Sequence, residues 1–220
     1  MCFFEQRAYS LLCEHNIQKL PVDTIALARK LGYVVLSFSQ AEEILISYNL
    51  LGHTKLYETF TVVIVDRAYI FYSDELTPSK RAQNIGHEIG HLQIDYPEIT
   101  SSLPTLIGHN ENEEEQEKKA NLFERYLLAP LPALDQRDVI SPGDIERLTG
   151  YDSRSAKEIY SGLMEYRQEQ ARIKQLQKIK KHFRRFTAAQ WIRFHHHGLI
   201  ISTLGFIIVI LTVLLLLSVL

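Results

Sequence analysis

One short motif constrains this chain more than any other feature: His87-Glu88-Ile89-Gly90-His91. On a helix, residues four apart lie about 5 to 6 Å from each other on one face, so the two imidazoles can reach one ion. Glu88 follows His87 directly, which leaves its carboxylate beside the ion and free to take a proton from water. The motif therefore requires a helix and predicts two zinc ligands, His87 and His91, and one catalytic base, Glu88.

The flanking sequence predicts that helix. Thr77 supplies a capping hydroxyl, and Pro78 suits the first helical position. Ile85, Ile89 and Leu92 recur at three- and four-residue spacing, as on the apolar face of a helix. A motif this short also occurs by chance in buried helices, so the rest of the chain has to support the zinc site.

A catalytic zinc ion usually takes three protein ligands and leaves the fourth position to water. We expect Glu117 to be the third ligand, on a second helix predicted over 111–128. Asn121 follows four residues later on the same side and can accept a hydrogen bond from the free ring N–H of a liganding histidine. A one-turn shift of this helix would bring Glu113 or Glu114 to the metal instead, and the sequence leaves this alternative open.

The remaining pattern predicts an α+β fold. Two short helices are expected first, over 4–15 and 23–31. Short runs rich in β-branched and aromatic residues then predict a small, mostly antiparallel sheet. These runs are 33–38, 44–50, 61–65 and 69–72. The last two are close enough in sequence to form a hairpin. Residues 95–110 are predicted to be a loop, and further helices are expected around 143–149 and after Asp152.

Charge is distributed unevenly along the chain. Residues 167–220 hold nine Lys and Arg against one Glu, a net charge of +8, whereas the preceding part carries −10. An acidic body disfavours a direct nucleic-acid role. The two cysteines, Cys2 and Cys13, have neither the density of a disulfide scaffold nor the spacing of a metal site, and the N-terminus has no signal-peptide run. The body is therefore expected in the cytosol.

The end of the chain predicts a membrane segment. Residues 198–220 form a run of 23 residues without a charge, rich in Leu, Ile and Val. Such a run can span a bilayer as a helix, whereas a buried core helix of this kind would need a large core around it. Trp191 and the preceding cations predict a single-pass helix with the body on the cytoplasmic side. The basic residues 167–197 are expected to form a helical stalk, as a short coiled coil or as a helix lying on anionic lipid.

Three blocks of sequence together are more specific than the motif alone. They are Leu20-Pro21-Val22-Asp23 with Leu31-Gly32-Tyr33, the motif at 87–91, and Glu117-Lys118-Lys119-Ala120-Asn121-Leu122-Phe123 with Leu127-Leu128-Ala129-Pro130. In order and spacing they resemble the ImmA/IrrE-type metallo-endopeptidase family. The resemblance implies a zincin-like metallopeptidase domain over 1–166, with zinc held by His87, His91 and Glu117 and with Glu88 as the base. Gln83 and Glu124 depart from the residues that are usual in the family.

The resemblance also implies a substrate, because members typically cleave a helix-turn-helix transcriptional repressor. We therefore expect a membrane-anchored endopeptidase that acts on a cytosolic regulatory protein. The alternative is a membrane-tethered zinc-binding regulator that holds a protein partner without cutting it. The presence of Glu88 disfavours this alternative, since a structural zinc site closes with four ligands and needs no free base.

The sequence does not identify the group that stabilises the developing oxyanion. His109 and Tyr126 are candidates by residue type only. His195-His196-His197 is interpreted as a polar cluster at the membrane boundary.

Overall fold

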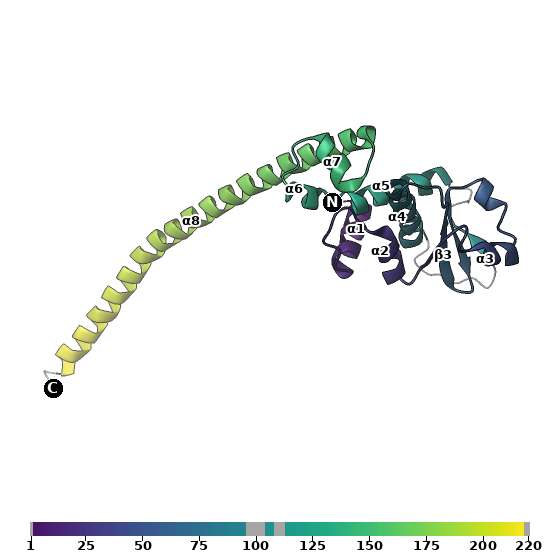
Figure 1. Cartoon of the computed structure of the whole chain (residues 1–220). Helices are drawn as coiled ribbons and strands as arrows, with labels where there is room; N and C mark the ends of the chain where they lie inside the picture. The colour runs from purple at the N-terminus through teal and green to yellow at the C-terminus, as the bar shows by residue number, and fades with distance from the viewer. Residues whose placement is uncertain (1, 96–103, 108–112, 218–220) are drawn as a thin grey trace. The chain divides into compact units, whose positions relative to one another are not determined.

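The computed structural model describes the backbone of residues 2–95, 104–107 and 113–217, and their side chains except those of 113, 185–206, 209 and 212–217. The chain divides into two compact units, Met1–Glu165 and Tyr166–Leu220. The elements can be followed in Figure 1. The helices are α1 (Phe3–Glu14), α2 (Thr24–Lys30), α3 (Glu42–Ser47), the 3-10 helix η1 (His53–Lys55), α4 (Pro78–Ile94), α5 (Glu113–Leu128), α6 (Leu131–Asp135), α7 (Pro142–Thr149) and α8 (Ser153–Leu217). The strands are β1 (Val34–Ser37), β2 (Thr59–Ile64), β3 (Arg67–Tyr72) and β4 (Thr105–Leu106).

The four strands form one sheet in the order β1-β3-β2-β4. β1 pairs parallel with β3, whereas β2 pairs antiparallel with β3 and with β4. The prediction of a small, mostly antiparallel sheet in an α+β fold is confirmed. β2 and β3 form the predicted hairpin, and its turn residues Val65 and Asp66 have positive φ angles of 47° and 57°. Two-residue turns of this kind match the twist of the paired strands.

The strand predicted over 44–50 is wrong, because residues Glu42–Ser47 form helix α3. Two acidic residues in its first turn favour the positive end of a helix, and only Leu45 is buried, as expected for one side of a short helix. The remaining strand of the sheet is β4, which lies in the segment predicted as a loop. Other residues of that segment, 96–103 and 108–110, lie outside the described residues.

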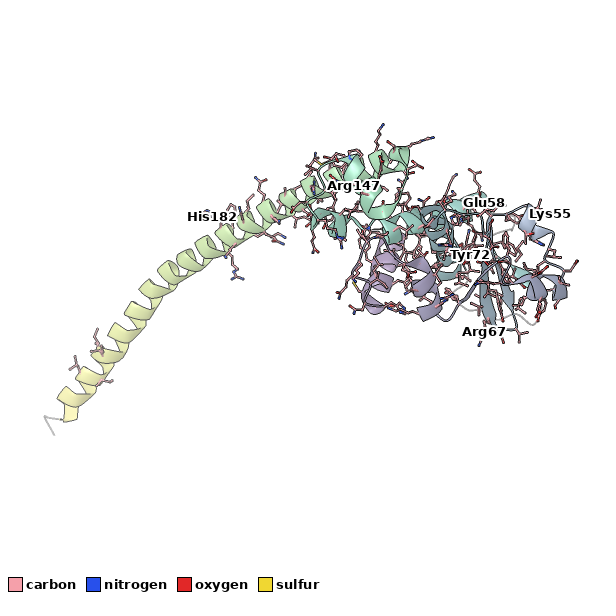
Figure 2. All side chains as sticks on the ribbon, in the orientation of Figure 1. Lys55, Glu58, Arg67, Tyr72, Arg147 and His182 are labelled. Atoms are coloured by element: carbon pink, nitrogen blue, oxygen red, sulfur yellow. The ribbon has the colours of Figure 1, made fainter. Side chains whose placement is uncertain are left out.

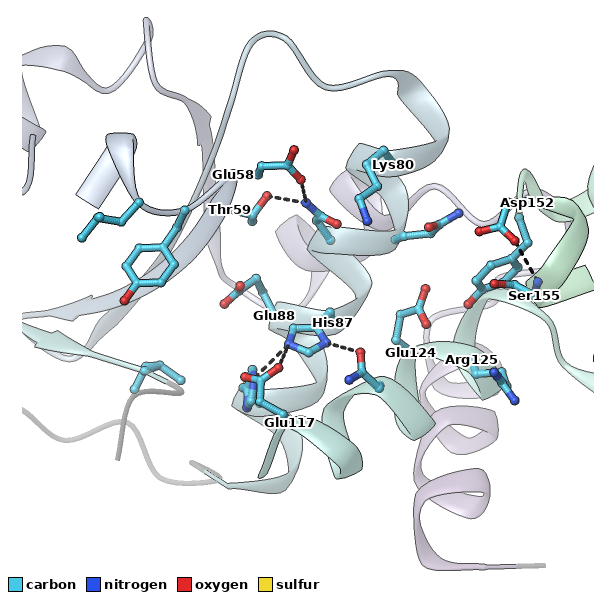
Figure 3. Close-up of a pocket in the computed structure, with 18 residues that line it drawn as sticks. Glu58, Thr59, Lys80, His87, Glu88, Glu117, Glu124, Arg125, Asp152 and Ser155 are labelled. Atoms are coloured by element: carbon cyan, nitrogen blue, oxygen red, sulfur yellow. Dashed lines mark hydrogen bonds and ion pairs between the residues drawn. The ribbon is translucent and has the colours of Figure 1, made fainter. Parts of the chain in front are cut away.

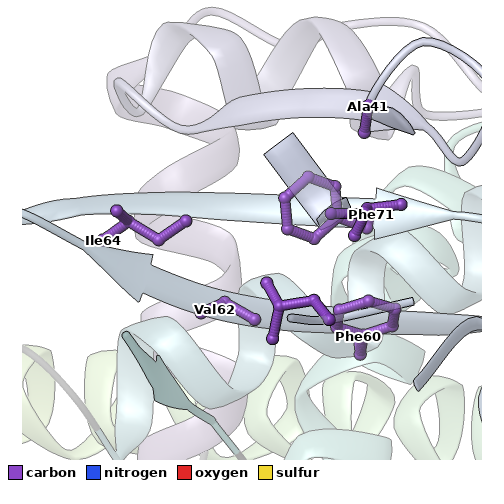
Figure 4. Packing of buried hydrophobic residues seen from close by; sticks show 7 residues of the cluster. Ala41, Phe60, Val62, Ile64 and Phe71 are labelled. Carbon is purple, nitrogen blue, oxygen red and sulfur yellow. The ribbon is translucent and has the colours of Figure 1, made fainter. Parts of the chain in front are cut away.

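The two faces of β2 pack against different layers, because successive side chains of a strand point to opposite faces. Phe60, Val62 and Ile64 belong to a buried cluster with α3 and β3 (Figure 4). Phe60 lies opposite Phe71 in the sheet register, and their ring centroids are 5.4 Å apart. Thr61 points to the other face, where α4 lies against β2 and β3. The sheet is therefore a rigid support for α4.

The helices predicted to carry the site are confirmed, and local sequence explains where they begin and end. The Thr77 hydroxyl oxygen accepts a hydrogen bond from the Lys80 N–H at 3.3 Å, and Pro78 occupies the first turn of α4. α5 ends at Leu128, two residues before Pro130, which cannot continue a helix.

From Tyr166 onward the described chain is helical and belongs to α8, whose described side chains, such as that of His182, are drawn in Figure 2. The structure does not support the predicted transmembrane helix, since no helix in the described part of the chain is long and apolar enough to cross a membrane. Most side chains of 198–220, and those of 195–197, lie outside the description. The membrane segment therefore stays a prediction from sequence.

Candidate metal centre

The two motif histidines and Glu117 meet between α4 and α5 (Figure 3). The His91 Nε2 atom lies 3.0 Å from His87 Nε2 and 3.1 Å from Glu117 Oε1. His87 Nε2 lies 3.2 Å from the other oxygen of the same carboxylate. Tetrahedral zinc ligands at bond lengths of about 2.0 to 2.2 Å lie about 3.3 to 3.6 Å apart, close to these separations. The three side chains could therefore hold a metal ion.

The outer nitrogens of both rings are anchored by hydrogen bonds. His87 Nδ1 lies 3.0 Å from Asn121 Oδ1, and His91 Nδ1 lies 3.2 Å from Asp95 Oδ2. Each oxygen accepts a hydrogen bond from the ring, which places the proton on Nδ1 and leaves the Nε2 lone pair free. Two such lone pairs and a carboxylate then point at one another, and they repel unless a cation lies between them. The donor chemistry therefore fits a bound metal.

Gly90 allows α5 to come close enough to contribute Glu117. A Cβ atom at position 90 would lie 3.1 Å from the Cα and the carbonyl oxygen of Ala120, and 3.2 Å from the Phe123 ring. Both neighbours are fully buried and belong to the packed face of α5. The glycine of the motif thus permits a direct approach of the two backbones at the level of the metal donors.

Glu88 is buried beside the donor cluster, with 8% of its surface exposed. The Thr61 hydroxyl donates a hydrogen bond of 2.6 Å to Glu88 Oε2. Burial raises the pKa of the Glu88 carboxyl to about 7, and the Thr61 hydrogen bond and the nearby His91 offset only part of this rise. A carboxyl group with a pKa near 7 can both take and return a proton at neutral pH.

Electrostatics also favours the ligating form of His87. Burial and the neighbouring His91 lower the pKa of the His87 imidazole, against the opposing effects of Glu117 and Asn121. The ring is therefore held neutral, which is the form that binds metals.

A cavity of about 690 Å³ opens beside these residues. All three donors and Glu88 line it, and so do Glu124 and Tyr151, which lie farther along the chain. Its volume is in the range of sites that bury small molecules or several side chains of a peptide.

The structure brings together every residue predicted for the site, His87, Glu88, His91, Glu117 and Asn121. Glu114 is 87% exposed and pairs with Lys118 at 2.5 Å, so it does not join the cluster. The side chain of Glu113 lies outside the described residues.

Two residues of the site were not predicted, Asp95 and Thr61. Asp95 follows His91 by four residues, the same spacing that joins the motif histidines, so the sequence carried a signal for it. Thr61 carried none, because its position opposite Glu88 depends on how α4 packs on β2.

Of the two candidates for oxyanion stabilisation, Tyr126 does not lie at the donor cluster. Tyr126 packs edge-on against Tyr9 with ring centroids 6.1 Å apart, and it does not line the cavity. His109 lies outside the described residues.

A small sheet that supports a His-Glu-x-x-His helix, with a glutamate helix beside it, defines a metallopeptidase-like domain. Comparison with known families agrees with this class. Residues 38–158, more than half of the 220 residues, match the peptidase family described as the IrrE N-terminal-like domain. The chain belongs to this family. A search of curated proteins found no match.

Proposed function

We propose that this protein is a zinc-dependent endopeptidase that cleaves a cytosolic regulatory protein, and that residues 198–220 tether it to a membrane. One observation carries the enzymatic part: the donor atoms of His87, His91 and Glu117 converge beside the buried carboxyl of Glu88, at a cavity large enough for a peptide. Membership of a peptidase family supports the same reaction class.

In this proposal His87, His91 and Glu117 hold the ion. Zinc, when bound, lowers the pKa of a water molecule towards neutrality and polarises a peptide carbonyl. Asn121 and Asp95 keep the two imidazole rings in the orientation and tautomer that ligation needs.

Glu88 moves the proton. Thr61 occupies its Oε2 atom, which fixes the carboxylate plane and leaves the second oxygen to accept a proton from water. The same carboxyl then delivers that proton to the leaving amine when the peptide bond breaks. Burial raises the pKa of this carboxyl in the metal-free chain, which helps it to hold the proton between the two steps.

The substrate and location are proposed on sequence grounds. The resemblance to the ImmA/IrrE-type family favours a helix-turn-helix transcriptional repressor as substrate. The nine Lys and Arg between 167 and 193, followed by an uncharged run, favour a single-pass anchor with the catalytic unit on the cytoplasmic side. A tethered enzyme would then reach repressors in the cytosol.

The decisive experiment compares the parent with Glu88→Gln, since this change removes the base and spares the metal ligands. We expect equal zinc content in the two purified full-length proteins and a loss of cleavage of about 10²- to 10⁴-fold in the variant. Proteomics of cut sites in cells that express each form identifies the substrate. A variant that still cuts near the parent rate would overturn the role of Glu88.

Zinc binding by both forms with no cut peptide in either would favour the second function, a tethered regulator that binds its partner without cleaving it. Protease protection in sealed vesicles tests the topology separately. The unit that contains His87 should be accessible from the cytoplasmic side, and its protection on the opposite side would exclude both the proposed orientation and a cytosolic substrate.

A further inference from the structure

The cavity extends from the metal centre to a second polar position on α5, the helix that carries Glu117. Glu117, Asn121 and Glu124 are spaced by four and three residues on α5, so they lie on one face of the helix, and all three line the cavity. With a rise of about 1.5 Å per residue, Glu124 lies about 10 Å from Glu117 along the helix axis. The carboxyl of Glu124 is therefore within the reach of a peptide whose backbone passes the metal.

Two buried polar atoms at this second position lack a hydrogen bond of normal geometry. Glu124 and Tyr151 are each only 8% exposed. Glu124 Oε1 and the Tyr151 hydroxyl form no hydrogen bond of normal distance and angle with any described residue, and they lie close enough to each other that each shifts the pKa of the other. In Figure 3 no dashed line reaches Glu124. A buried polar atom without a hydrogen bond lowers the stability of the folded protein by about 1 to 3 kcal/mol, and by more when the group is charged. Such atoms are rare in native proteins, and a bound ligand that supplies the missing hydrogen bond explains them.

The charges nearby indicate which ligand fits. Glu58 and Asp152 also line the cavity, so with Glu124 its lining holds three carboxylates besides Glu88 and Glu117. Two cations also line the cavity, Arg125, which is bound to Glu158 at 2.7 Å, and Lys80, which is exposed, and both act to lower the pKa of the Glu124 carboxyl. The balance is negative, which favours a positively charged group.

We propose that Glu124 and Tyr151 form a subsite that accepts a lysine or arginine side chain of the substrate, within about three residues of the cleaved bond, since an extended peptide advances about 3.3 Å per residue. This inference rests on the proposed peptidase function. An ammonium or guanidinium group donates to both free oxygens at once, and charge-assisted hydrogen bonds of this kind are the stronger ones. An apolar side chain would leave the buried Glu124 Oε1 without a hydrogen bond.

Peptide cleavage by the full-length, zinc-loaded protein tests the subsite. The probe is a proteome-derived peptide library cut after glutamate, so that internal Lys and Arg are kept. We expect Lys and Arg to be enriched at one position within three residues of the cut. In synthetic peptides that differ only by Lys or norleucine there, Glu124→Gln should reduce the Lys over norleucine ratio of kcat/KM by about 10- to 100-fold.

Glu114→Gln is the matched control, because it removes an exposed carboxylate from the same helix outside the cavity. It should keep the parent ratio. Tyr151→Phe should lower the ratio less than Glu124→Gln does, since it removes one neutral hydroxyl. Cleavage without a Lys or Arg preference, or a preference that survives Glu124→Gln, would overturn the subsite.

A binding measurement separates failure of the subsite from failure of the peptidase function. n-Butylguanidinium mimics an arginine side chain. Its NMR signals should broaden when the full-length parent is added and should stay sharp with Glu124→Gln. Thermal unfolding checks that both proteins are folded. Binding without any peptide cleavage would keep the cation subsite and reject the peptidase. Absence of both would reject both proposals.

Discussion

The two ends of the cavity satisfy their buried polar atoms differently. At the metal end, defined by His87, His91 and Glu117, the Nδ1 atom of each ring has a hydrogen-bond partner within 3.2 Å. At the other end, defined by Glu124 and Tyr151, the buried oxygens have none among the described residues. The metal end holds its donors in place through the protein itself, whereas the Glu124 end depends on something that enters the cavity.

The difference also concerns rigidity. The metal end lies where α4 and α5 approach through Gly90 and the backbone of Ala120. At the Glu124 end the same two helices are separated by side chains, with Glu124 Cγ and Leu128 facing Gly86. Preorganised donors suit an ion that demands fixed geometry, and looser packing suits a side chain that differs from one peptide to another.

The largest effect is expected when a metal ligand is removed. Glu117→Ala should lower zinc affinity by more than 100-fold, because it deletes one of three ligands, while Glu114→Ala on the same helix should leave the affinity unchanged. Competition with a zinc-binding dye measures both. A loss in Glu114→Ala with a normal Glu117→Ala would mean that α5 docks one turn away from the arrangement described above.

The next prediction concerns pH and the Glu124 end. Burial raises the pKa of the Glu124 carboxyl to about 7, against about 4.3 in an unfolded chain. Between these values the folded chain keeps a proton that the unfolded chain has released, so the stability from this group is full at low pH and is lost as pH rises through 7. Relative to Glu124→Gln, the parent should lose on the order of 3 kcal/mol of unfolding free energy between pH 4 and pH 8.

Denaturant unfolding of both proteins across that range measures the difference, and effects of zinc or of Glu88 cancel because both proteins contain them. Stability curves that run parallel would show that Glu124 is already compensated in the folded protein, and the contrast between the two ends would disappear.

A smaller effect is expected from the residues that hold the histidine rings. Asn121→Ala and Asp95→Ala should each weaken zinc binding by about 10- to 100-fold, since the imidazoles keep their ligating atoms and lose only their orientation. Equilibrium dialysis against a chelator gives the affinities. If either variant lost as much zinc affinity as Glu117→Ala, the side chain removed would itself be a metal ligand.

The metal end was predictable from sequence because its parts lie on two helices with recognisable signals. Thr77 and Pro78 mark the start of α4, and four-residue spacing aligns His87 with His91 and Glu117 with Asn121. The pairing of the two helices followed from the chemistry of a three-ligand site, which requires them to meet.

The Glu124 end was not predictable, because it joins segments with no common local pattern. Tyr151 lies 27 residues after Glu124, between α7 and α8, and only tertiary packing brings it to the cavity. Thr61 is separated from Glu88 by the same distance in sequence. The error at α3 has a different cause: a short apolar run such as Ile44-Leu45-Ile46 fits a strand or a helix equally well until its buried side is known.

The smallest effects are expected from alanine substitutions at two glycines of α4, Gly86 and Gly90. Replacing a helical glycine by alanine gains about 0.5 to 1 kcal/mol from the unfolded chain. At Gly86 the new methyl group would meet the Glu124 Cγ at 3.4 Å, an ordinary contact with a side chain, so Gly86→Ala should stabilise the protein by up to about 1 kcal/mol.

At Gly90 the methyl group would instead meet the Ala120 backbone at 3.1 Å, which can move only if α5 moves with it. Overpacking of this kind costs about 1 to 3 kcal/mol, so Gly90→Ala should be destabilised by about 1 kcal/mol net and should also bind zinc more weakly, because Glu117 shifts with the helix. Urea unfolding and zinc titration of the matched pair test this. If the two variants have the same unfolding free energy and zinc affinity, the close approach of α4 and α5 at Gly90 does not set the geometry of the metal end. The two ends of the cavity would then not differ in how tightly the helices pack.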